Sequence, residues 1–280
     1  MRRVLVTGAR GMLGSEVVAA LSTTTDVLAA DVTEFDVTDA AAVRRAVRAA
    51  AADAVINCAA WTDVDGAETH RTEAFAVNAE GAGNVARAAA EAGAWLLHVS
   101  TDYFFDGSKH CPYDEDDEPR PMNAYGESKL AGEREVAAAG GRSLVARTAW
   151  LYGRRGRNFV DTVLARARGG EALRIVSDQV GPPTSARDLA VVIAELVPTG
   201  ATGVVHATNS GSCSWYELGR RALELAGLSG AAVQSVPSSA FRRPAARPAN
   251  SVLRLYRLVS LIGWLPRPLD EALRDYILKG

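Results

Sequence analysis

Cysteine is scarce in this chain, and its scarcity excludes two classes of protein. The 280 residues include three cysteines, Cys58, Cys111 and Cys213, which are odd in number and far apart. Disulfide frameworks need paired cysteines, and zinc sites need closely spaced Cys and His ligands. We therefore expect neither a disulfide scaffold nor a zinc site, and the pattern fits the reducing cytoplasm.

Long apolar runs are also missing. No run approaches the roughly 20 residues that a membrane-spanning helix needs. The apolar run that follows Arg3 is too short for a signal peptide. Basic runs interleaved with aromatic residues, which are typical of nucleic-acid-binding surfaces, do not occur either. The sequence thus predicts a cytoplasmic protein with no membrane or nucleic-acid partner.

The charged residues are divided unevenly along a chain of otherwise ordinary composition. Hydrophobic residues make up 48% and charged residues 23%, as in many globular enzymes. Residues 1–140 contain 12 Lys and Arg against 23 Asp and Glu, whereas residues 141–280 contain 19 against 10. The basic half is a candidate site for an anionic ligand, although an ordinary solvated surface has the same composition.

A glycine-rich segment near the start has the context of a dinucleotide-binding turn. Residues 3–7 read as a buried strand, Gly8 to Gly14 as a G-x-x-G-x-x-G turn and residues 15–21 as a helix. Such glycines let the backbone approach a pyrophosphate, whose charge lies at the helix N-terminus. Asp31 follows the next strand near the spacing expected for an acid that binds the ribose of NAD. Arg10 could instead contact a 2′-phosphate, so NADH and NADPH both remain open.

Strands and helices alternate through the first half of the chain. The predicted strands cover residues 3–7, 27–30, 54–58, 95–100 and 143–147. A long helical segment is expected over roughly residues 71–92. This rhythm predicts an α/β fold: a doubly wound parallel, Rossmann-type sheet, with a smaller mixed α/β substrate-binding domain towards the C-terminus. We expect the dinucleotide-binding domain to comprise residues 1–150 and about 186–210, and the substrate domain about 151–185 and 211–280.

Several chemically useful residues fall at the carboxyl ends of the predicted strands. Ligands of doubly wound sheets bind beyond these ends. Gly8, Asp31, Ala59 and Thr101 all occupy such positions. Ala59 and Ala60 are small enough to let a flat nicotinamide dinucleotide pass close to the backbone. The placement of all these residues at strand ends is stronger evidence for a ligand-binding site than any one motif.

Tyr125 and Lys129 form a candidate acid/base pair. They are four residues apart, which places both side chains on one face of a helix. A free phenol has a pKa of about 10, and a nearby ammonium stabilises the phenolate and lowers that pKa. The pair is a plausible acid/base device, but the same spacing is common on solvated helices. Its assignment depends on whether the rest of the chain supplies a cofactor and a carbonyl.

Seven segments, taken in order, carry a family resemblance. They are residues 6–14, 57–65, 100–107, 125–133, 147–153, 178–184 and 247–251. Over nearly its whole length the chain resembles the extended short-chain dehydrogenase/reductases, and within them the dTDP-4-dehydrorhamnose reductases. The resemblance implies NAD(P)H-dependent reduction of the C4 ketone of a dTDP-4-dehydro-6-deoxy sugar, with dTDP-4-dehydro-L-rhamnose as substrate and dTDP-L-rhamnose as product.

The resemblance also implies roles for individual residues. Tyr125 is expected to be the general acid, Lys129 its electrostatic partner and a ligand of the nicotinamide ribose, and Thr101 a hydrogen-bond donor to the substrate carbonyl. Together with the strand ends and loops, it implies cofactor contacts from Gly8, Arg10, Gly11, Met12, Leu13, Gly14, Asp31, Asp36, Val37, Ala59, Ala60, Trp61, Tyr125 and Lys129. It implies substrate contacts from Thr62, Val64, Thr101, Asp102, Tyr103, Tyr125 and Trp150.

The substrate diphosphate needs cations, which the basic half supplies. The candidates are Arg154, Arg155, Arg157, Arg242, Arg243 and Arg247, and we favour Arg247. The chain departs from the family pattern at Trp61, where Tyr or His is usual, and at Phe104, where Val is usual. Glu16 matches one of the glutamates that hold magnesium at a dimer contact in some relatives. The other glutamates have no assignable match, so we predict no metal and leave monomer and homodimer open.

Other functions remain open on this scaffold. A related reductase would act on another dTDP-4-keto-6-deoxyhexose in antibiotic sugar synthesis. An epimerase or dehydratase is a second alternative, but a dehydratase is expected to have two acids after Thr101, and Tyr103 follows Asp102 here. A non-catalytic binding subunit is the third alternative, and the intact set of Thr101, Tyr125 and Lys129 argues against it.

Overall fold

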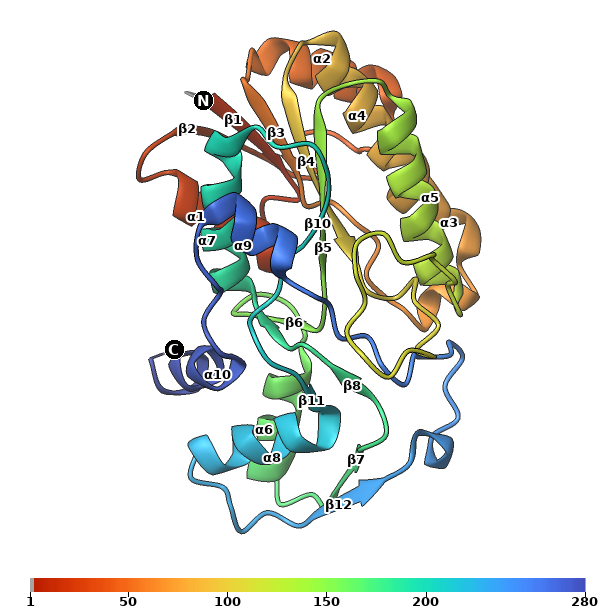
Figure 1. Cartoon of the computed structure of the whole chain (residues 1–280), viewed down its shortest axis with the longest axis vertical. Coiled ribbons are helices and arrows are strands. Elements are labelled where there is room, and N and C mark those ends of the chain that lie inside the picture. Colours follow the sequence, from red (N-terminus) through yellow and green to blue (C-terminus); the bar gives the residue numbers. More distant parts are fainter. Residues whose placement is uncertain (1–2, 280) are drawn as a thin grey trace.

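A parallel sheet forms the centre of the larger part of the molecule (Figure 1). The computed structural model describes residues 3–279, and within them the largest sheet has six strands in the order β10-β5-β4-β3-β1-β2. These strands are β1 (Arg3–Thr7), β2 (Asp26–Ala30), β3 (Ala54–Asn57), β4 (Trp95–Thr101), β5 (Ser143–Thr148) and β10 (Gly203–His206). All neighbouring strands pair in parallel. The predicted doubly wound parallel sheet is confirmed.

Helices cover both faces of this sheet because alternate strand residues point to opposite sides. In β1, Val4 and Val6 belong to the core on one face, whereas Leu5 belongs to the core on the other. The first face is covered by α1 (Met12–Leu21), α7 (Ala186–Leu196) and α9 (Tyr256–Ile262). The second face is covered by α2 (Ala40–Ala50), α4 (Ala82–Glu91) and α5 (Ala124–Ala138).

A smaller part with its own apolar core lies below the sheet in Figure 1. Its helices are α6 (Phe159–Arg168), α8 (Trp215–Leu225) and α10 (Leu269–Leu278). Its strands are β7 (Leu173–Val176), β8 (Val180–Gly181), β11 (Cys213–Ser214) and β12 (Val233–Val236). Between the two parts, β6 (Leu151–Tyr152) pairs with β9 (Thr184–Ser185). Short 3₁₀ turns are η1 (Gly66–Glu68), η3 (Val197–Thr199) and η4 (Ser238–Ala240).

The path of the chain bears on the expected division into domains. After β9 the chain returns to the sheet as α7 and β10, then goes back to the smaller part. The helix α9 lies in the segment expected to belong to the substrate domain, yet it packs on α7 at the sheet. The division into two folding domains therefore stays a prediction. No helix between residues 3 and 279 is long and apolar enough to cross a membrane.

The helical segment predicted over roughly residues 71–92 is present, but it is not one regular α-helix. The structure has α3 (Arg71–Phe75), a π-helical segment η2 (Ala76–Gly81) and then α4. The α5 helix approaches this wider turn closely: a Cβ added at Gly132 would lie 2.1 Å from the carbonyl oxygen of Asn78. Asn78 is buried there, and its amide donates to the Ser128 hydroxyl and to the Trp61 carbonyl. Hydrophobic periodicity alone does not reveal a π-helical turn, because the apolar face continues through it.

Candidate active site

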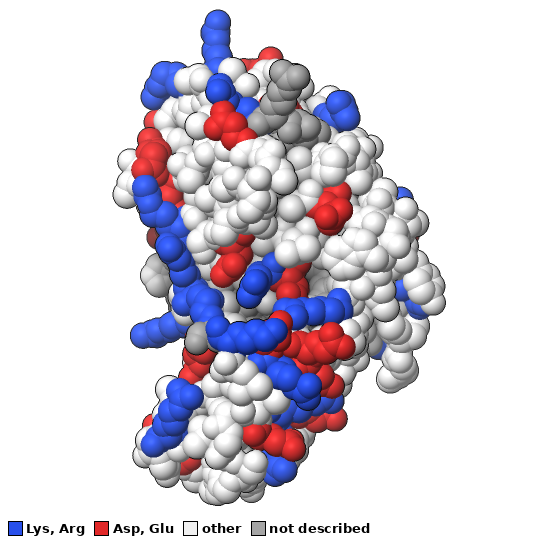
Figure 2. All heavy atoms as spheres, turned by 90° about the vertical axis from the view of Figure 1, so that its left-hand side faces the viewer, with Lys and Arg blue, Asp and Glu red and all other residues white. Residues whose placement is uncertain are grey.

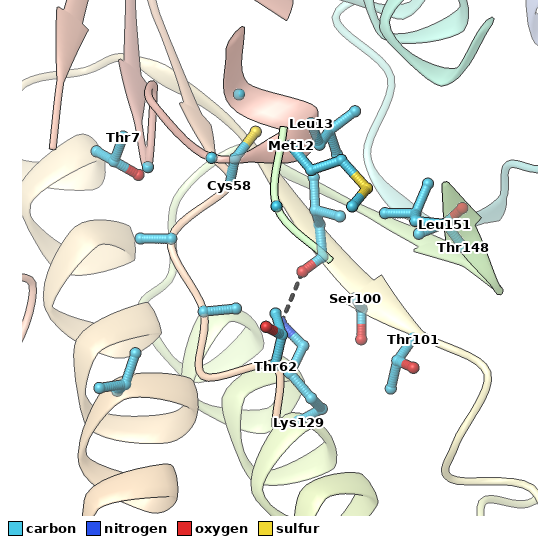
Figure 3. A pocket seen from close by; sticks show the side chains of 18 of the residues that line it. Thr7, Met12, Leu13, Cys58, Thr62, Ser100, Thr101, Lys129, Thr148 and Leu151 are labelled. Atoms are coloured by element: carbon cyan, nitrogen blue, oxygen red, sulfur yellow. Dashed lines mark hydrogen bonds between the residues drawn. The ribbon is translucent and has the colours of Figure 1, made fainter. Parts of the chain in front are cut away.

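A cavity of about 850 Å³ lies at the carboxyl ends of the central strands. Figure 3 shows side chains from the ends of β1, β3, β4 and β5 and from α5 around it. Every residue for which we predicted a cofactor or substrate contact lines this cavity, except Trp61 and Arg247. Parallel strands thus bring together positions that are far apart in sequence. Basic side chains gather between the two parts of the molecule on the face drawn in Figure 2.

The glycine turn between β1 and α1 is packed so tightly against neighbouring backbone that side chains do not fit at Gly8 and Gly14. Gly8 has a φ of +64°, and a Cβ there would lie 2.7 Å from the backbone nitrogen of Ala59. A Cβ at Gly14 would lie 2.1 Å from the carbonyl oxygen of Gly8. The α1 helix begins after Gly11 without a side-chain cap. Its first N–H groups are therefore available for a pyrophosphate, as expected for a dinucleotide site.

Asp31 and Arg10 lie together at the adenosine end of the predicted cofactor path. Asp31 Oδ2 accepts from the backbone nitrogen of Arg10 at 2.8 Å, and Oδ1 accepts from Val32 at 2.9 Å. The Arg10 guanidinium donates to Glu34 Oε1 at 2.5 Å and to the Thr33 hydroxyl. These contacts lower the pKa of Glu34 to about 2. The rim therefore offers an acid for ribose hydroxyls and a cation for a 2′-phosphate, and it fits both NADH and NADPH.

Tyr125 and Lys129 lie on the buried face of α5. This helix begins after Asn123, whose side chain accepts from the backbone nitrogen of Gly126. Lys129 is only 2% exposed, and its Nζ donates to the carbonyl oxygen of Val99 in β4 at 2.8 Å (Figure 3). Burial lowers the pKa of Lys129 to about 8. The amine is therefore still mostly an ammonium near neutral pH.

The phenol of Tyr125 remains protonated near neutral pH. Burial raises its pKa, the Thr101 hydroxyl opposes this change, and nearby Asp102 adds to it. We expected Lys129 to hold the pKa of Tyr125 below its ordinary value, but that pKa is raised because Lys129 does not outweigh burial. Its Nζ is bound to the β4 backbone, and burial dominates the environment of the phenol. A protonated phenol suits a general acid, and the ammonium can stabilise the phenolate once the proton has left.

Thr101 and Asp102 complete the polar wall beside Tyr125. The Thr101 hydroxyl donates to Asp102 Oδ1 at 3.3 Å and accepts from the backbone nitrogen of Tyr103 at 3.3 Å. Burial raises the pKa of Asp102 to about 7, although the Ser251 and Thr101 hydroxyls lower it. The edge of the Tyr103 ring meets the Tyr125 ring at a centroid distance of 5.6 Å. Polar groups thus surround the position that a substrate carbonyl must reach.

Two buried hydroxyls in the cavity were missed from the sequence. Ser100 and Thr148 line it from the ends of β4 and β5, and neither hydroxyl has a hydrogen-bond partner within residues 3–279. Buried polar groups without partners are costly, so these two are suited to hydrogen-bond a ligand. The sequence held a signal for them, because each lies at the end of a predicted strand.

Trp61 and Arg247 are not among the residues that line the cavity. Arg247 donates to both carboxylate oxygens of Asp65 at 2.8 Å, and its side chain is 13% exposed. Trp61 donates from its indole to the Asp63 carbonyl, and its backbone nitrogen donates to Asn78. The predicted arginines that do line the cavity are Arg155 and Arg157.

Trp150 closes the cavity on the side of the smaller part. Its backbone has a φ of +47°, which is unusual for a bulky residue. Its indole stacks on Trp215 of α8, with ring centroids 3.4 Å apart and planes 3° from parallel. A Cβ at Gly181 would lie 2.5 Å from this indole, so the position needs glycine. Strain at such a residue is often found at functional sites.

The parallel sheet, the uncapped glycine turn and the group of Thr101, Tyr125 and Lys129 together define a dinucleotide-dependent oxidoreductase. The family model described as the RmlD substrate binding domain matches residues 1–279. The chain belongs to this family, so the predicted resemblance is confirmed.

Individual relatives agree with this assignment. The chain is 44% identical to the dTDP-4-dehydrorhamnose reductase of Mycobacterium tuberculosis (strain CDC 1551 / Oshkosh) over 258 residues, which cover 90% of this chain and 84% of the relative. It is 40% identical to the dTDP-4-keto-6-deoxy-D-glucose reductase of Streptomyces niveus, with coverage of 90% and 88%. A solved dTDP-4-dehydrorhamnose reductase of Bacillus anthracis str. Ames, in complex with NADP, superposes with a TM-score of 0.96 at 37% identity, with coverage of 100% of both chains.

Proposed function

We propose that this protein reduces the C4 ketone of a dTDP-4-dehydro-6-deoxy sugar with NADPH or NADH. The first candidate substrate is dTDP-4-dehydro-L-rhamnose, and its product is dTDP-L-rhamnose. The convergence of Thr101, Tyr125 and Lys129 on one cavity with the glycine turn carries this proposal. Relatives named for this reaction cover most of the chain and support it. We place the protein among the short-chain dehydrogenase/reductases of the cytoplasm, as a monomer or homodimer.

The side chains in the cavity account for the proton side of the reaction. When bound, the reduced nicotinamide supplies the hydride that forms the new C–H bond at C4. The Thr101 hydroxyl donates a hydrogen bond to the ketone oxygen, and Tyr125 transfers its phenolic proton to the same oxygen as the charge develops there. The Lys129 ammonium stabilises the resulting phenolate until solvent returns a proton. The product is the C4 alcohol.

The remaining predicted contacts become proposals for binding. Gly8, Gly11 and Gly14 would hold the cofactor pyrophosphate against the start of α1, which is supported by the uncapped N-terminus of that helix. Ser100 and Thr148 would supply hydrogen bonds that the structure leaves unused. The other proposed cofactor contacts are Arg10, Met12, Leu13, Asp31, Asp36, Val37, Ala59, Ala60 and Trp61. The other proposed substrate contacts are Thr62, Val64, Asp102, Tyr103 and Trp150, with Arg155 and Arg157 in place of Arg247 for the diphosphate.

A reductase of another dTDP-4-keto-6-deoxyhexose is the alternative. It is supported by the similarity to the Streptomyces niveus enzyme, which is nearly as great as the similarity to the rhamnose enzymes. The two functions differ in which 4-keto sugar is reduced, and the configuration formed at C4 depends on how that sugar ring lies in the cavity.

One assay tests both functions. The protein is incubated with NADPH and dTDP-4-dehydro-L-rhamnose, or with dTDP-4-keto-6-deoxy-D-glucose, and the loss of absorbance of the reduced cofactor is followed. The product is then identified by NMR, which gives the configuration at C4. We expect turnover of the first substrate. Turnover of the second alone favours the alternative, and turnover of neither contradicts the proposed reaction.

A further inference from the structure

The buried face of α5 continues one turn past Lys129 to a third charged residue. Tyr125, Lys129 and Glu133 are spaced four residues apart, and all three are less than a tenth exposed. The mechanism above uses only the first two of them. A buried carboxylate is costly unless it is paired, so its presence behind the active site needs an explanation.

Glu133 is paired with an arginine that is equally buried. Arg147 of β5 donates from Nε to Oε1 at 3.1 Å and from one terminal nitrogen to Oε2 at 2.8 Å. The side chains of the two residues are 8% and 5% exposed. Arg147 also donates to the Glu115 carbonyl at 3.0 Å and lies over the Phe104 ring. This geometry holds the carboxylate in one place, because a guanidinium with two hydrogen bonds to it leaves little freedom.

We infer that the Glu133–Arg147 ion pair is a positioning device for the proposed reductase: it fixes a negative charge one helical turn from Lys129 and so keeps the amine of Lys129 in its ammonium form. The inference rests on the proposed function, in which that ammonium stabilises the Tyr125 phenolate. Glu133 is the group that most strongly opposes the effect of burial on the pKa of Lys129. Glu133 therefore acts through Lys129 and touches neither substrate nor cofactor.

The other titratable groups around Lys129 do not supply this charge. Cys58 has a pKa raised to about 12 by burial, and burial lowers the pKa of His98, so both are neutral. Asp102, with a pKa of about 7, is only partly ionised near neutral pH. Tyr125 is protonated.

Charged groups from the helices packed on α5 face other sides of it. Arg71 of α3 pairs with Glu127, Arg87 of α4 pairs with Glu135, Glu68 of η1 accepts from the backbone nitrogen of Ala124, and Glu80 of η2 is exposed. Glu133 is thus the buried acid, paired with Arg147, on the side of α5 that carries the active site.

The small number of lysines allows a direct test. The chain has three lysines, Lys109, Lys129 and Lys279, so protein labelled with ¹³C-lysine gives a simple spectrum in which each amine can be titrated. Lys109→Arg and Lys279→Arg variants assign the signal of Lys129. In Glu133→Gln we expect the pKa of Lys129 to fall from about 8 to about 7 or below, because the opposing charge is lost. Glu133→Asp keeps the charge but moves it away from Lys129. In this variant the pKa of Lys129 should lie between its values in the wild-type protein and in Glu133→Gln.

The matched control is Glu127→Gln, which removes the same charge from an exposed position on the same helix. It should leave the pKa of Lys129 unchanged. In the wild-type reaction kcat should fall as pH rises through the pKa of Lys129, and in Glu133→Gln this alkaline limb should move to lower pH by the same amount, with KM for the sugar nucleotide unchanged.

An unchanged pKa of Lys129 in Glu133→Gln overturns the inference, and so does a variant that loses thermal stability without any change of pH profile. If Glu133→Gln does not fold, Glu133→Asp carries the test with the same criterion. The NMR titration needs no turnover, so its failure is distinct from a failure of the proposed function, which shows as wild-type protein that oxidises no NADPH with either sugar.

Discussion

The sheet and the smaller part below it hold their residues in different ways. Strands of four to seven residues form the sheet, and both of its faces are buried under helices. The smaller part has strands of two to four residues in separate pairs, and its arginine loop, residues 154–157, is exposed. Rigid strand ends can hold reacting groups precisely, whereas exposed loops can adapt to a bound ligand. We therefore propose that the sheet holds the groups that react with the substrate, and that the smaller part binds the negatively charged phosphates of the ligand.

The Tyr125→Phe variant is the strongest test of the proposal that the reacting groups are held by the sheet and the helices packed on it. The variant keeps the buried ring but loses the proton that, in the proposed mechanism, is transferred to the ketone oxygen. We expect kcat to fall by roughly 10²–10⁴-fold, the usual range for loss of a general acid, while NADPH binding stays nearly unchanged. Stopped-flow turnover and a fluorescence titration of NADPH measure the two effects. Near-normal turnover would remove Tyr125 from the mechanism.

The next largest effect is expected from the ionisation of Asp102, which should make the free energy of unfolding depend on pH. The folded protein has a pKa of about 7 for this acid, above its ordinary value of 3.8, so ionisation opposes folding. Its contribution to stability is complete below about pH 4 and is lost as pH rises through about 7. Relative to Asp102→Asn, the wild-type free energy of unfolding should fall by up to about 4 kcal/mol over this range. Urea unfolding of both proteins across the range measures it, and parallel curves would contradict the burial of this charge.

A pair of glycine substitutions separates the effect of a positive φ alone from that of a positive φ combined with a backbone clash in the glycine turn. Gly8→Ala combines a positive φ with a Cβ 2.7 Å from the Ala59 nitrogen, so we expect a loss of stability of about 2–3 kcal/mol and weak NADPH binding. Gly93→Ala has a similar φ of +70° but open space around its Cβ. It should cost only about 1 kcal/mol and leave NADPH binding intact. Equal effects at both positions would show that the turn has no special role in binding.

The smallest effect is expected in the smaller part. Arg155→Gln and Arg157→Gln each remove a cation from the cavity, and each should raise KM for a phosphate-bearing ligand by about tenfold while leaving stability unchanged. Arg247→Gln is the comparison, because that arginine is bound to Asp65. It should lower the melting temperature with little change in KM. A rise in KM for Arg247→Gln alone would restore the original expectation that it binds the diphosphate.

Local sequence patterns were enough to predict several parts of the fold and of the candidate site. The turn from Gly8 to Gly14 and the pair of Tyr125 and Lys129 could be placed because each depends on neighbours within one or two turns of chain. The parallel sheet followed from the alternation of strands and helices. The ion pair between Arg247 and Asp65 could not be predicted, because the two residues are 182 positions apart in the sequence.

The amino-acid sequence by itself determined the class of fold, through the alternation of strands and helices, and the family, through the resemblance carried by seven short segments. The residues proposed for the chemistry follow from that resemblance. Only the tertiary structure decided the protonation of Tyr125, Lys129 and Asp102, because burial and distant partners set the pKa of each group. It also decided which arginines face the cavity and that Glu133 is buried behind Lys129. These outcomes depend on how β4, β5 and α5 pack together, which no local segment encodes.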